Sequence, residues 1–382
     1  MHARTSTKIT KKIKRPLGGG AKMKKLVLGL MSGTSADGLT VCAIVPHPFQ
    51  IVHFKNYPYT PQFQHTLLTA YALKAPQLSQ LHYQIGAHYA KTVLQFLKDF
   101  HLTPAQITAV GMHGQTVYHG PQDKTPNTLQ LGEPSFLAAA LNCPVVSDFR
   151  ALDIVLGGQG APLIPFFDQY IFGKKSPKML LNIGGISNLS IVGKNIQTQG
   201  CDCGPGNTLI DLACQAHFKK PFDTNGSLAA RGTPDKMRVQ KLLKQKFFRT
   251  RPPKSLDKNT FGAAYLKRYF SIKNPHDLLA TLTYFTAAAT AQSIAQFVPA
   301  NEQKELIISG GGCYNKTLLR FLQALLPHVH ISTSAAYGID PHAKEAAAFA
   351  LFAWLCLKRR TNHCAGATGA QKNAILGKIT YA

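Results

Sequence analysis

The sequence predicts an α/β protein made of two similar domains with a ligand cleft between them. Three observations lead to this prediction. The chain has 382 residues, which is too long for one ordinary hydrophobic core. Two apolar runs separated by a turn rich in glycine and serine occur at 26–45 and again at 179–192, as expected if one hairpin heads each half. A third glycine-rich turn, Gly310–Gly312, follows another apolar run.

Each predicted element has a local sequence signal. The predicted strands are apolar runs that end at polar or glycine-rich turns, and they lie at 26–30, 41–45, 51–54, 107–112, 179–183, 189–192 and 305–309. Two predicted helices, at 77–99 and 315–326, have apolar residues at helical spacing. A third, at 343–357, is rich in alanine. No run approaches the ~20 apolar residues that a membrane-spanning helix needs, so we expect no membrane partner.

The composition is globular but strongly basic. Lysine and arginine total 43 against 17 aspartate and glutamate residues, a net charge of +26, which favours anionic partners. Nine of the basic residues lie in the first 25, and the basic run Lys241–Arg251 contains no nucleic-acid-binding motif. A solvated basic face therefore explains the charge better than nucleic-acid binding. Residues 1–22 are predicted to form a disordered basic arm outside the fold.

The cysteine pattern argues against a metal site and against export. The eight cysteines show no repeated C-x-x-C spacing and no nearby cysteine–histidine quartet, so we expect no structural metal. The basic N-terminal residues are not followed by the apolar segment of an export signal. We therefore expect free thiols in a reducing cytoplasm. The sequence does not decide between a monomer and a homodimer.

The two hairpin turns could hold the phosphates of a nucleotide. Glycine lets the backbone approach a ligand closely, and successive N–H groups with the hydroxyls of Ser32, Thr34 and Ser35 can bind phosphate oxygens. The alternative, which either turn alone would favour, is a plain hairpin connection. The third turn, Gly310–Gly312, leaves room for a flat base and its ribose. The chain has no G-x-x-x-x-G-K-[ST] loop of the Walker type.

Polar residues at other turns are candidates for catalysis and sugar binding. Asp202 lies in a Gly- and Pro-rich turn after the second hairpin. If Asn207 caps the following helix, this carboxylate is free to face the cleft and to accept a proton. The His-Gly-Gln-Thr sequence after the fourth predicted strand offers hydrogen-bonding groups for a sugar. Arg150 either binds a substrate carboxylate or pairs with Asp148 or Asp153, and the internal pair is favoured.

Several of these turns together resemble those of a known family. The shared motifs are Leu28–Gly38, His113–Thr116, Asp148–Arg150, Gly157–Pro162, Asn182–Asn188, Asp202–Asn207, Gly310–Gly312 with Asn315, Glu345–Ala350 and Thr368–Ala370. They occur in consistent order between residues 26 and 377, and their combination resembles the anhydro-N-acetylmuramic acid kinases. That family belongs to the actin-like superfamily of sugar kinases and chaperone ATPases. The resemblance thus implies duplicated, ribonuclease-H-like domains with an interdomain cleft.

The resemblance also implies an ATP-dependent hydrolytic kinase of cell-wall (peptidoglycan) recycling. Such an enzyme opens the 1,6-anhydro ring of anhydro-N-acetylmuramic acid with water and phosphorylates O6, which yields N-acetylmuramate 6-phosphate. Asp202 matches the general base that deprotonates the water. Glu345 matches an acidic residue near the site, and its alternative is an ordinary helix-surface residue beside Lys344. ATP and Mg²⁺ are the implied cofactors, the metal being held largely by phosphates and waters.

Binding residues and domain limits follow from the same motif match. The implied nucleotide contacts are Gly33, Thr34, Ser35, Ala36, Asp37, Gly38, Leu39, Thr40, Gly184, Gly185, Gly310, Gly311, Gly312 and Asn315. The implied sugar contacts are His113, Gln115, Thr116, Asp148, Arg150, Gly204 and Asn207. The first domain is expected to hold 23–150 and 340–382, and the second 151–339. Ala36, Thr40 and Cys201 depart from the family pattern, which commonly has a larger apolar residue, an aspartate and an aromatic residue there.

Three other functions are open alternatives from the sequence. Another sugar kinase of the superfamily would phosphorylate a free hydroxyl and add no water. A nucleotide-dependent switch, as in the actin-like chaperones, would hydrolyse ATP without a sugar and normally carries a large peptide-binding appendage, of which the sequence shows no sign. A nucleic-acid-binding protein, argued from charge alone, leaves every glycine-rich motif unexplained.

Overall fold

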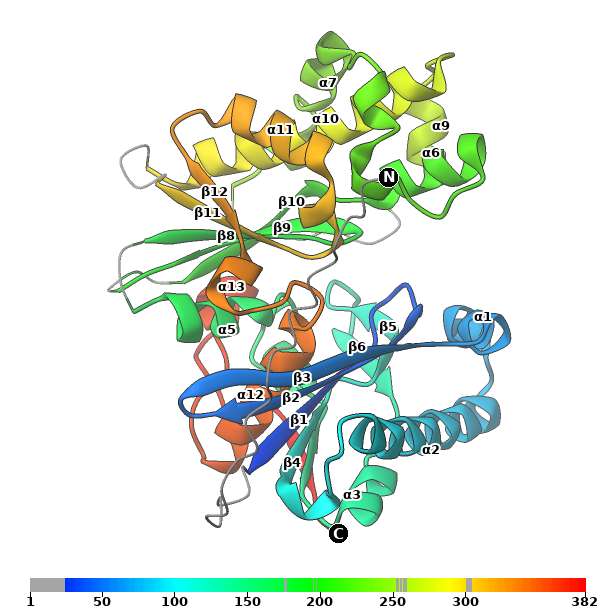
Figure 1. The fold of residues 1–382 in the computed structure, drawn as a ribbon, viewed down its shortest axis with the longest axis vertical. Helices are drawn as coiled ribbons and strands as arrows, with labels where there is room; N and C mark the ends of the chain where they lie inside the picture. Colours follow the sequence, from blue (N-terminus) through cyan, green and yellow to red (C-terminus); the bar gives the residue numbers. More distant parts are fainter. Residues whose placement is uncertain are drawn as a thin grey trace, which may run out of the picture.

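The computed structural model describes residues 25–174, 177–194, 196, 198–251, 254, 256, 260–299 and 304–382. The predicted arm at 1–22 lies outside the described residues. Two lobes are stacked one above the other, and each is built around its own sheet (Figure 1). Among the described residues, no helix is long and apolar enough to cross a membrane.

The first sheet has six strands in the order β13-β7-β4-β1-β2-β3. These strands are β1 (Leu26–Met31), β2 (Gly38–Pro46), β3 (Phe49–Pro58), β4 (Ile107–Met112), β7 (Val145–Ser147) and β13 (Lys378–Thr380). Strand β2 lies between β1 and β3 and runs antiparallel to both, whereas β4 lies parallel to β1 and to β7. A separate small hairpin consists of β5 (Gln115–Gly120) and β6 (Asn127–Leu131).

The second sheet repeats this arrangement in the order β10-β9-β8-β11-β12. Its strands are β8 (Lys178–Ile183), β9 (Ile186–Val192), β10 (Gln199–Pro205), β11 (Glu305–Ser309) and β12 (His330–Thr333). Here β9 is antiparallel to β8 and β10, and β11 is parallel to β8 and β12. The same strand order with a reversed second strand thus occurs twice, which is the predicted duplication of a ribonuclease-H-like domain. The chain has the actin-like fold.

Helices cover the sheets and connect the strands. They are α1 (Pro61–Thr69), α2 (Ala75–Asp99), α3 (Ser135–Leu141), α4 (Ala151–Val155), α5 (Ile164–Phe172), α6 (Thr208–Phe218), α7 (Lys236–Leu242), α8 (Lys246–Arg249), α9 (Ala263–Tyr269), α10 (Pro275–Phe297), α11 (Lys316–Leu325), α12 (Lys344–Leu357) and α13 (Ala365–Thr368). The predicted helices correspond to α2, α11 and α12. The start of α11 is fixed by the Asn315 side chain, which accepts the Leu318 amide at 2.9 Å.

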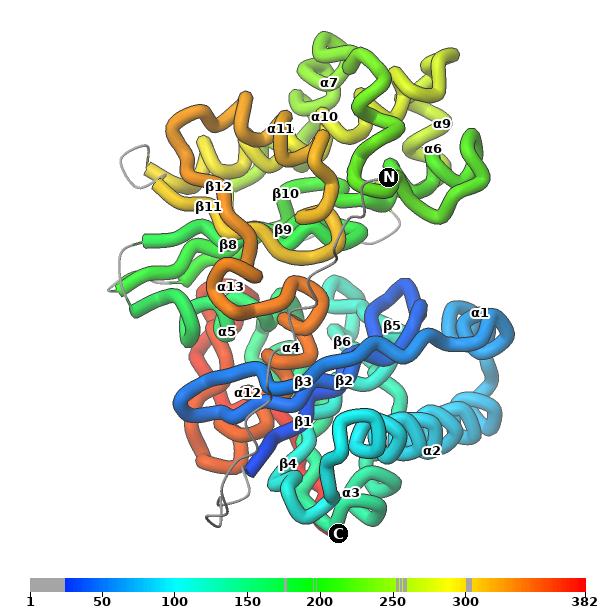
Figure 2. Tube along the Cα trace, viewed as in Figure 1, coloured from blue at the N-terminus to red at the C-terminus, as the bar shows by residue number. Residues whose placement is uncertain are grey.

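The chain returns to the first lobe after it completes the second. Helix α12 follows β12 in the sequence but packs on β1, β2 and β4, where Figure 2 shows it among the N-terminal strands. Its alanine-rich sequence permits this close packing, and two glycines complete it. A Cβ atom on Gly29 would lie 1.8 Å from the Ala346 carbonyl oxygen, and one on Gly111 would lie 2.0 Å from that of Phe349. The C-terminal segment therefore belongs to the first sheet, although the exact domain limits remain predictions.

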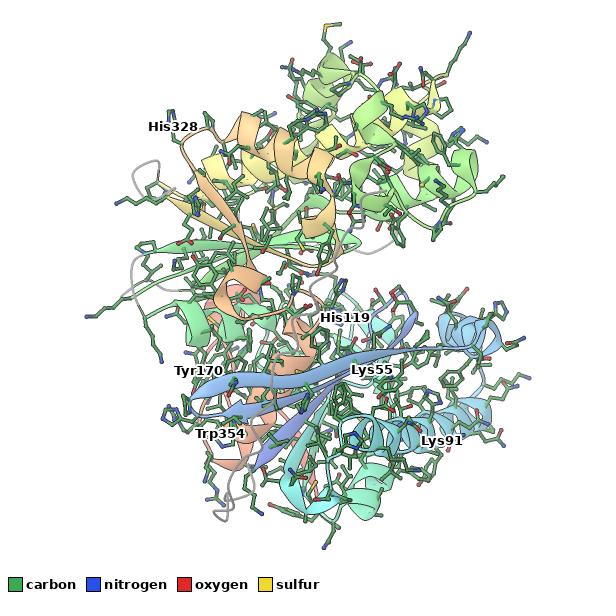
Figure 3. All side chains as sticks on the ribbon, in the orientation of Figure 1. Lys55, Lys91, His119, Tyr170, His328 and Trp354 are labelled. Carbon is green, nitrogen blue, oxygen red and sulfur yellow. The ribbon has the colours of Figure 1, made fainter. Side chains whose placement is uncertain are left out.

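A buried ion pair lies where the two lobes meet. Lys344 on α12 and Asp168 on α5 approach to 2.7 Å, and both side chains are almost completely buried. The same ammonium donates to the Ser309 hydroxyl, at the end of β11, at 3.3 Å. Tyr170, also on α5, lies at this junction as well (Figure 3). One charged cluster thus joins elements that pack on both sheets.

Candidate active site

The tip of the first hairpin, residues 32–37, is held by side chains. The buried Ser32 hydroxyl donates to Gln115 Oε1 at 2.5 Å, and the Tyr59 hydroxyl donates to Ser32 Oγ at 3.0 Å. Gln115 in turn donates from Nε2 to the Gly33 carbonyl at 3.2 Å. Gln115 therefore supports the tip from beneath. The exposed residues of the tip are Thr34, Ser35 and Asp37.

Four residues implied as nucleotide contacts have side chains, or a Cβ position, that already contact other parts of the first lobe. Ala36 and Leu39 are completely buried in the core of the first lobe. A Cβ on Gly38 would lie 2.6 Å from the Tyr57 carbonyl oxygen. The Thr40 hydroxyl donates to Asn56 at 3.1 Å. Any contact of these four residues with a nucleotide is thus restricted to backbone groups, except for Thr40, which is half-buried.

The tip of the second hairpin, Gly184–Gly185, is held by three backbone amides and one hydroxyl. The Gly185 carbonyl accepts the amides of Gly206 at 2.8 Å and Thr208 at 3.2 Å, and the Thr208 hydroxyl at 2.8 Å. The Asn207 amide donates to the Gly184 carbonyl at 2.8 Å. A Cβ on Gly206 would lie 2.2 Å from the Gly184 oxygen, so this approach requires glycine. The start of α6 and the tip thus form one unit.

A cavity of about 430 Å³ lies between Asp37 of the first tip and the start of α6. Its lining residues are Asp37, Asn207, Ile210, Asp211, Phe222, Asp223, Thr224, Asn225, Gly311, Tyr314, Asn315 and His342. The volume suits a small-molecule ligand. The structure thus brings together Asp37, Gly311 and Asn315, three residues implied as nucleotide contacts. Asn207, implied as a sugar contact, lines this same cavity instead of the one between the lobes, and residues from 210–225 that sequence reasoning missed complete the lining.

Two carboxylates that sequence reasoning missed face this nucleotide-sized cavity. Burial, followed by the nearby Asp223 charge, raises the pKa of Asp211 to about 7. Asp223 itself accepts the amides of Leu228 and Ala229, each at 2.9 Å. Asp211 follows Asn207 by four residues, which is about one turn of α6. Its helical spacing on α6 is the signal that could have identified it.

Asp202 lies on β10 and is held by the segment that follows α8. Its amide donates to the Lys254 carbonyl at 3.0 Å, and its Oδ2 accepts the Leu256 amide at 2.7 Å. Burial raises the pKa of Asp202 to about 6, and the Leu256 hydrogen bond and the Lys254 charge oppose this increase. The group is therefore ionised at neutral pH yet basic enough to accept a proton.

His113 and Arg150 form a buried pair in the first lobe. Arg150 donates from Nε to His113 Nε2 at 3.0 Å and from Nη1 to the Gly160 carbonyl at 2.6 Å. The other ring nitrogen of His113 then carries the proton and donates to the Gly114 carbonyl at 2.8 Å. Burial and the Arg150 charge lower the pKa of His113 to about 3, so the ring is neutral. Burial also raises the pKa of Glu345, and the nearby Arg150 charge reduces this increase.

The favoured pairing of Arg150 with Asp148 or Asp153 is wrong. Asp148 pairs with Lys378 at 2.5 Å and accepts the Ala151 amide at 3.3 Å. Asp153 instead contacts His363 and Thr368 of the C-terminal segment. The short chain distance between these residues favoured the pairing, but the turn after β7 directs the guanidinium toward His113 and Gly160 instead.

Asp153 joins two loops that come from distant parts of the sequence. Its carboxylate accepts the Gly160 amide at 2.5 Å and the Thr368 hydroxyl at 2.6 Å, and it pairs with His363 at 2.5 Å. Burial raises its pKa, but these hydrogen bonds outweigh the effect, and the pKa lies below its ordinary value. The Gly157–Pro162 loop and the loop around Thr368 are thereby held together.

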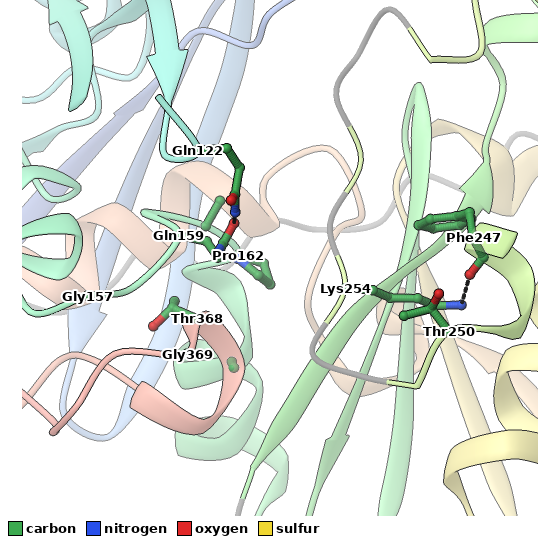
Figure 4. Close-up of a pocket in the computed structure, with 11 residues that line it drawn as sticks. Gln122, Gly157, Gln159, Pro162, Phe247, Thr250, Lys254, Thr368 and Gly369 are labelled. Carbon is green, nitrogen blue, oxygen red and sulfur yellow. Dashed lines mark hydrogen bonds between the residues drawn. The ribbon is translucent and has the colours of Figure 1, made fainter. Parts of the chain in front are cut away.

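These two loops form one wall of a second cavity, of about 500 Å³, between the lobes. Its lining residues are Gln122, Gly157, Gln159, Ala161, Pro162, Phe247, Thr250, Lys254, Ala367, Thr368 and Gly369. Figure 4 shows Phe247, Thr250 and Lys254 of the second lobe facing Gln159 and Thr368 across it. Lys254 lines this cavity and its carbonyl accepts the Asp202 amide, so the candidate base lies behind the cavity wall and is not itself one of the lining residues.

Three other residues from the motif match have contacts within their own lobe. The Thr116 hydroxyl accepts Gln130 Nε2 at 3.3 Å. The Gly204 carbonyl accepts the Ser187 hydroxyl at 3.2 Å. Gly310 has a φ of 78°, which favours glycine and turns the chain sharply after β11. No group of three metal-ligating side chains occurs within the described ranges, and the eight cysteines are all free thiols.

Comparison with known proteins gives a consistent result. The sequence profile of the family "Anhydro-N-acetylmuramic acid kinase" matches residues 25–382. The kinase of that name from Albidiferax ferrireducens is 37% identical, with 94% of this chain and 99% of the relative covered. The one from Pasteurella multocida is 36% identical, with 92% and 96% covered. The one from Caldanaerobacter subterraneus subsp. tengcongensis is 34% identical, with 94% and 98% covered.

Similarity to solved structures is weaker. Component A of the Acidaminococcus fermentans (R)-2-hydroxyglutaryl-CoA dehydratase aligns with a TM-score of 0.48 and 13% identity, covering 87% of this chain and 98% of that one. The fold assignment therefore depends on the strand order of the two sheets. With the family profile spanning nearly the whole chain and relatives matched end to end, this chain belongs to the anhydro-N-acetylmuramic acid kinase family.

Proposed function

We propose that this kinase opens the 1,6-anhydro ring of anhydro-N-acetylmuramic acid with water and transfers the γ-phosphoryl group of ATP to O6. The product is N-acetylmuramate 6-phosphate, an intermediate of peptidoglycan recycling. The observation that carries the proposal is the environment of Asp202, a carboxylate with a pKa of about 6 whose supporting segment lines the interdomain cavity. A second sugar kinase activity on a free hydroxyl is not favoured, because the relatives matched over their whole length carry the anhydro-sugar name.

In the proposed reaction Asp202 accepts a proton from a water molecule as the water oxygen bonds to C1 of the sugar. The C1–O6 bond breaks, and its electron pair remains on O6. O6 bonds to the γ-phosphorus of ATP while the bond from that phosphorus to the bridging oxygen of ADP breaks. Asp202 then releases its proton to solvent. A positioned base of this kind supplies about 10²–10⁴-fold, and alignment of O6 with the phosphate supplies much of the remainder.

The two hairpin tips are proposed to hold the triphosphate. The Gly33–Asp37 tip offers exposed hydroxyls and backbone groups, and the Gly184–Gly185 tip is fixed by the start of α6. The cavity between Asp37 and the start of α6 would take the adenosine, with Gly310–Gly312 beside it. Glu345 and Arg150 are proposed to orient the sugar or the attacking water from the first lobe.

The oxygen chemistry at the cavity also fits Mg²⁺ bound with the nucleotide. Asp37 is an exposed carboxylate on the cavity wall. Mg²⁺ readily binds through one carboxylate, phosphates and waters. When bound, the metal neutralises charge on the transferring phosphoryl group. We also propose a cytoplasmic location, since all eight cysteines are unpaired.

The test is turnover of anhydro-N-acetylmuramic acid with ATP and Mg²⁺ in water enriched in ¹⁸O. The product should be heavier than the substrate by one water and one phosphoryl unit, and the ¹⁸O should be at C1. A kinase that acts on a free hydroxyl would add phosphate alone, which would contradict the proposal.

Asp202→Asn is the matched variant. The asparagine oxygen can still accept the Leu256 amide, so folding should be preserved. We expect kcat to fall by about 10²–10⁴-fold with little change in the affinity for ATP. Near-normal turnover by a folded variant would exclude Asp202 as the base.

A further inference from the structure

The proposed substrate carries a carboxylate on its lactyl ether, and a cation is needed to bind it. Arg150 is the obvious candidate from the sequence, but its guanidinium is already used inside the first lobe. Its Nε and Nη1 donate to His113 and to the Gly160 carbonyl, and Nη2 lies 2.9 Å from His113 Nε2. The Glu345 charge lies nearby as well. A further carboxylate would have to displace one of these partners.

Lys254 has a different environment, on the opposite wall of the interdomain cavity. Its ammonium donates to the Phe247 carbonyl at 3.3 Å and lies 4.6 Å from the centroid of the Phe247 ring and 5.4 Å from that of Phe297. In Figure 4 the side chain runs along the second-lobe wall of the cavity toward Phe247. None of the ion pairs among the described residues includes Lys254.

The charge of the cavity lining points the same way. Of the eleven described residues that line the cavity, Lys254 is the one that carries a charge. The others are neutral polar side chains, such as Gln122 and Thr250, or apolar groups. A half-buried cation without an acidic residue in the cavity lining attracts an anion more strongly than it would in open water. Partial burial already lowers the pKa of Lys254, so an anionic partner would relieve a real cost.

We propose that Lys254 binds the carboxylate of the lactyl ether and so selects the muramic over the glucosamine form of the anhydro-sugar. This inference rests on the proposed function, because it presupposes that sugar. The connection to catalysis is direct: the Lys254 carbonyl accepts the amide of Asp202 at 3.0 Å. The residue that binds the acidic substituent thereby also fixes the strand that carries the base, which places C1 of a correctly bound sugar near Asp202.

A second explanation for Lys254 is electrostatic. Its ammonium stabilises the ionised form of Asp202, so its loss would raise the pKa of that carboxyl without any contact to the sugar. That effect would reduce turnover of all anhydro-sugars equally and move the pH profile upward. Contact with the lactyl carboxylate would instead change affinity, and only for the sugar that carries this group. The two explanations therefore predict different measurements.

The experiment compares Lys254→Met with wild type by calorimetric binding of two sugars in the absence of ATP. The sugars are anhydro-N-acetylmuramic acid and 1,6-anhydro-N-acetylglucosamine, which has the same bicyclic ring with a hydroxyl in place of the lactyl ether. Charge-assisted hydrogen bonds contribute enough for roughly 10–100-fold in affinity. We expect wild type to prefer the acidic sugar by at least about tenfold, and Lys254→Met to lose this preference while its affinity for the neutral sugar is unchanged.

The control is Lys246→Met, an exposed lysine on the preceding helix α8. It removes the same charge from the same region and should retain the wild-type preference. Lys254→Arg should retain part of it. Equal weakening of both sugars in Lys254→Met, or an unchanged preference, would overturn the assignment, as would a wild type that does not distinguish the sugars. If wild type binds the acidic sugar but does not phosphorylate it, the proposed function fails, and the affinity ratios still decide the role of Lys254.

Discussion

The two lobes share a strand order, yet their hairpin tips are held in different ways. In the first lobe the tip rests on a side-chain network, in which Gln115 connects the Ser32 hydroxyl and the Gly33 carbonyl. In the second lobe three backbone amides at the start of α6 bind the carbonyls of Gly184 and Gly185. The first tip displays exposed hydroxyl side chains, whereas the second consists of two glycines.

This difference shows that duplication of a fold does not duplicate its chemistry. A tip held by backbone bonds keeps its shape whatever side chains surround it, and it presents pre-oriented N–H groups to an anion. A tip held by side chains can be altered at a single buried position. We therefore expect the second tip to be sensitive to added volume and the first to be sensitive to lost hydrogen bonds.

The largest effect should come from Gly206→Ala in the second lobe. The new Cβ would lie 2.2 Å from the Gly184 oxygen and 3.0 Å from the Ile186 carbonyl carbon, and both are backbone atoms that cannot turn aside. We expect a loss of about 3 kcal/mol in the free energy of unfolding and a rise of at least about tenfold in KM for ATP. Chemical denaturation and steady-state kinetics measure the two quantities.

Gly33→Ala is the matched control in the first lobe. Its new Cβ would have the Ser35 hydroxyl, 3.8 Å away, as its nearest neighbour. The free energy of unfolding should change by less than about 0.5 kcal/mol. Similar losses for the two variants would show that the tips are equally tolerant and that the comparison between them is mistaken.

The next largest loss of stability should come from Gln115→Leu in the first lobe. The change leaves the buried Ser32 hydroxyl without its acceptor and the Gly33 carbonyl without a donor, which costs about 1–3 kcal/mol. We expect KM for ATP to rise because the tip loses its support. Thr116→Val, at the neighbouring position, removes a hydroxyl that accepts a hydrogen bond from Gln130 within the small hairpin, and it should leave KM for ATP unchanged.

Asp202 in the second lobe and Asp37 at the first tip should differ in their effect on the pH dependence. Asp202 has a pKa of about 6 because of burial, so below this pH its protonated form cannot accept a proton from water. We expect kcat/KM to fall about tenfold per pH unit below 6 and to level off above it. Asp37→Asn, at the exposed first tip, should leave this inflection in place. If the inflection moves in Asp37→Asn, the titrating group belongs to the first lobe, and its assignment to Asp202 is wrong.

Much of the fold could be predicted from the sequence because its hairpins and helices have local signals. The apolar face of α2, with Leu81, Ile85, Tyr89 and Val93 buried, has the spacing of an amphipathic helix. Helix α10 was missed because it is buried along most of its length and has no polar face to define a period. The edge strand β13 has three residues, too few for any pattern.

Site residues could be predicted where they belong to one continuous motif. Contacts between segments that are distant in the sequence could not, because they depend on packing. The motif match grouped Asp37, Gly311 and Asn315 as nucleotide contacts, and these three residues line one cavity. It assigned Asn207 to the sugar, whereas Asn207 lines that same cavity. It could not show that His113 accepts from Arg150, because 37 residues separate them and the contact depends on how β4 and β7 lie in the sheet. Lys254 was missed for the same reason, since it reaches the cavity only through its pairing with β10.

The smallest effect should come from Thr208→Val in the second lobe. The Thr208 hydroxyl donates to the Gly185 carbonyl at 2.8 Å, but that oxygen also accepts the amides of Gly206 and Thr208 itself. Valine has nearly the same shape, and the group is exposed, so the loss should stay near 0.5–1 kcal/mol, about the net value of one hydrogen bond. KM for ATP should change by less than about threefold. A loss as large as that of Gln115→Leu would mean that the Thr208 side chain supports the second tip as strongly as Gln115 supports the first, and that the two lobes do not differ in how their tips are held.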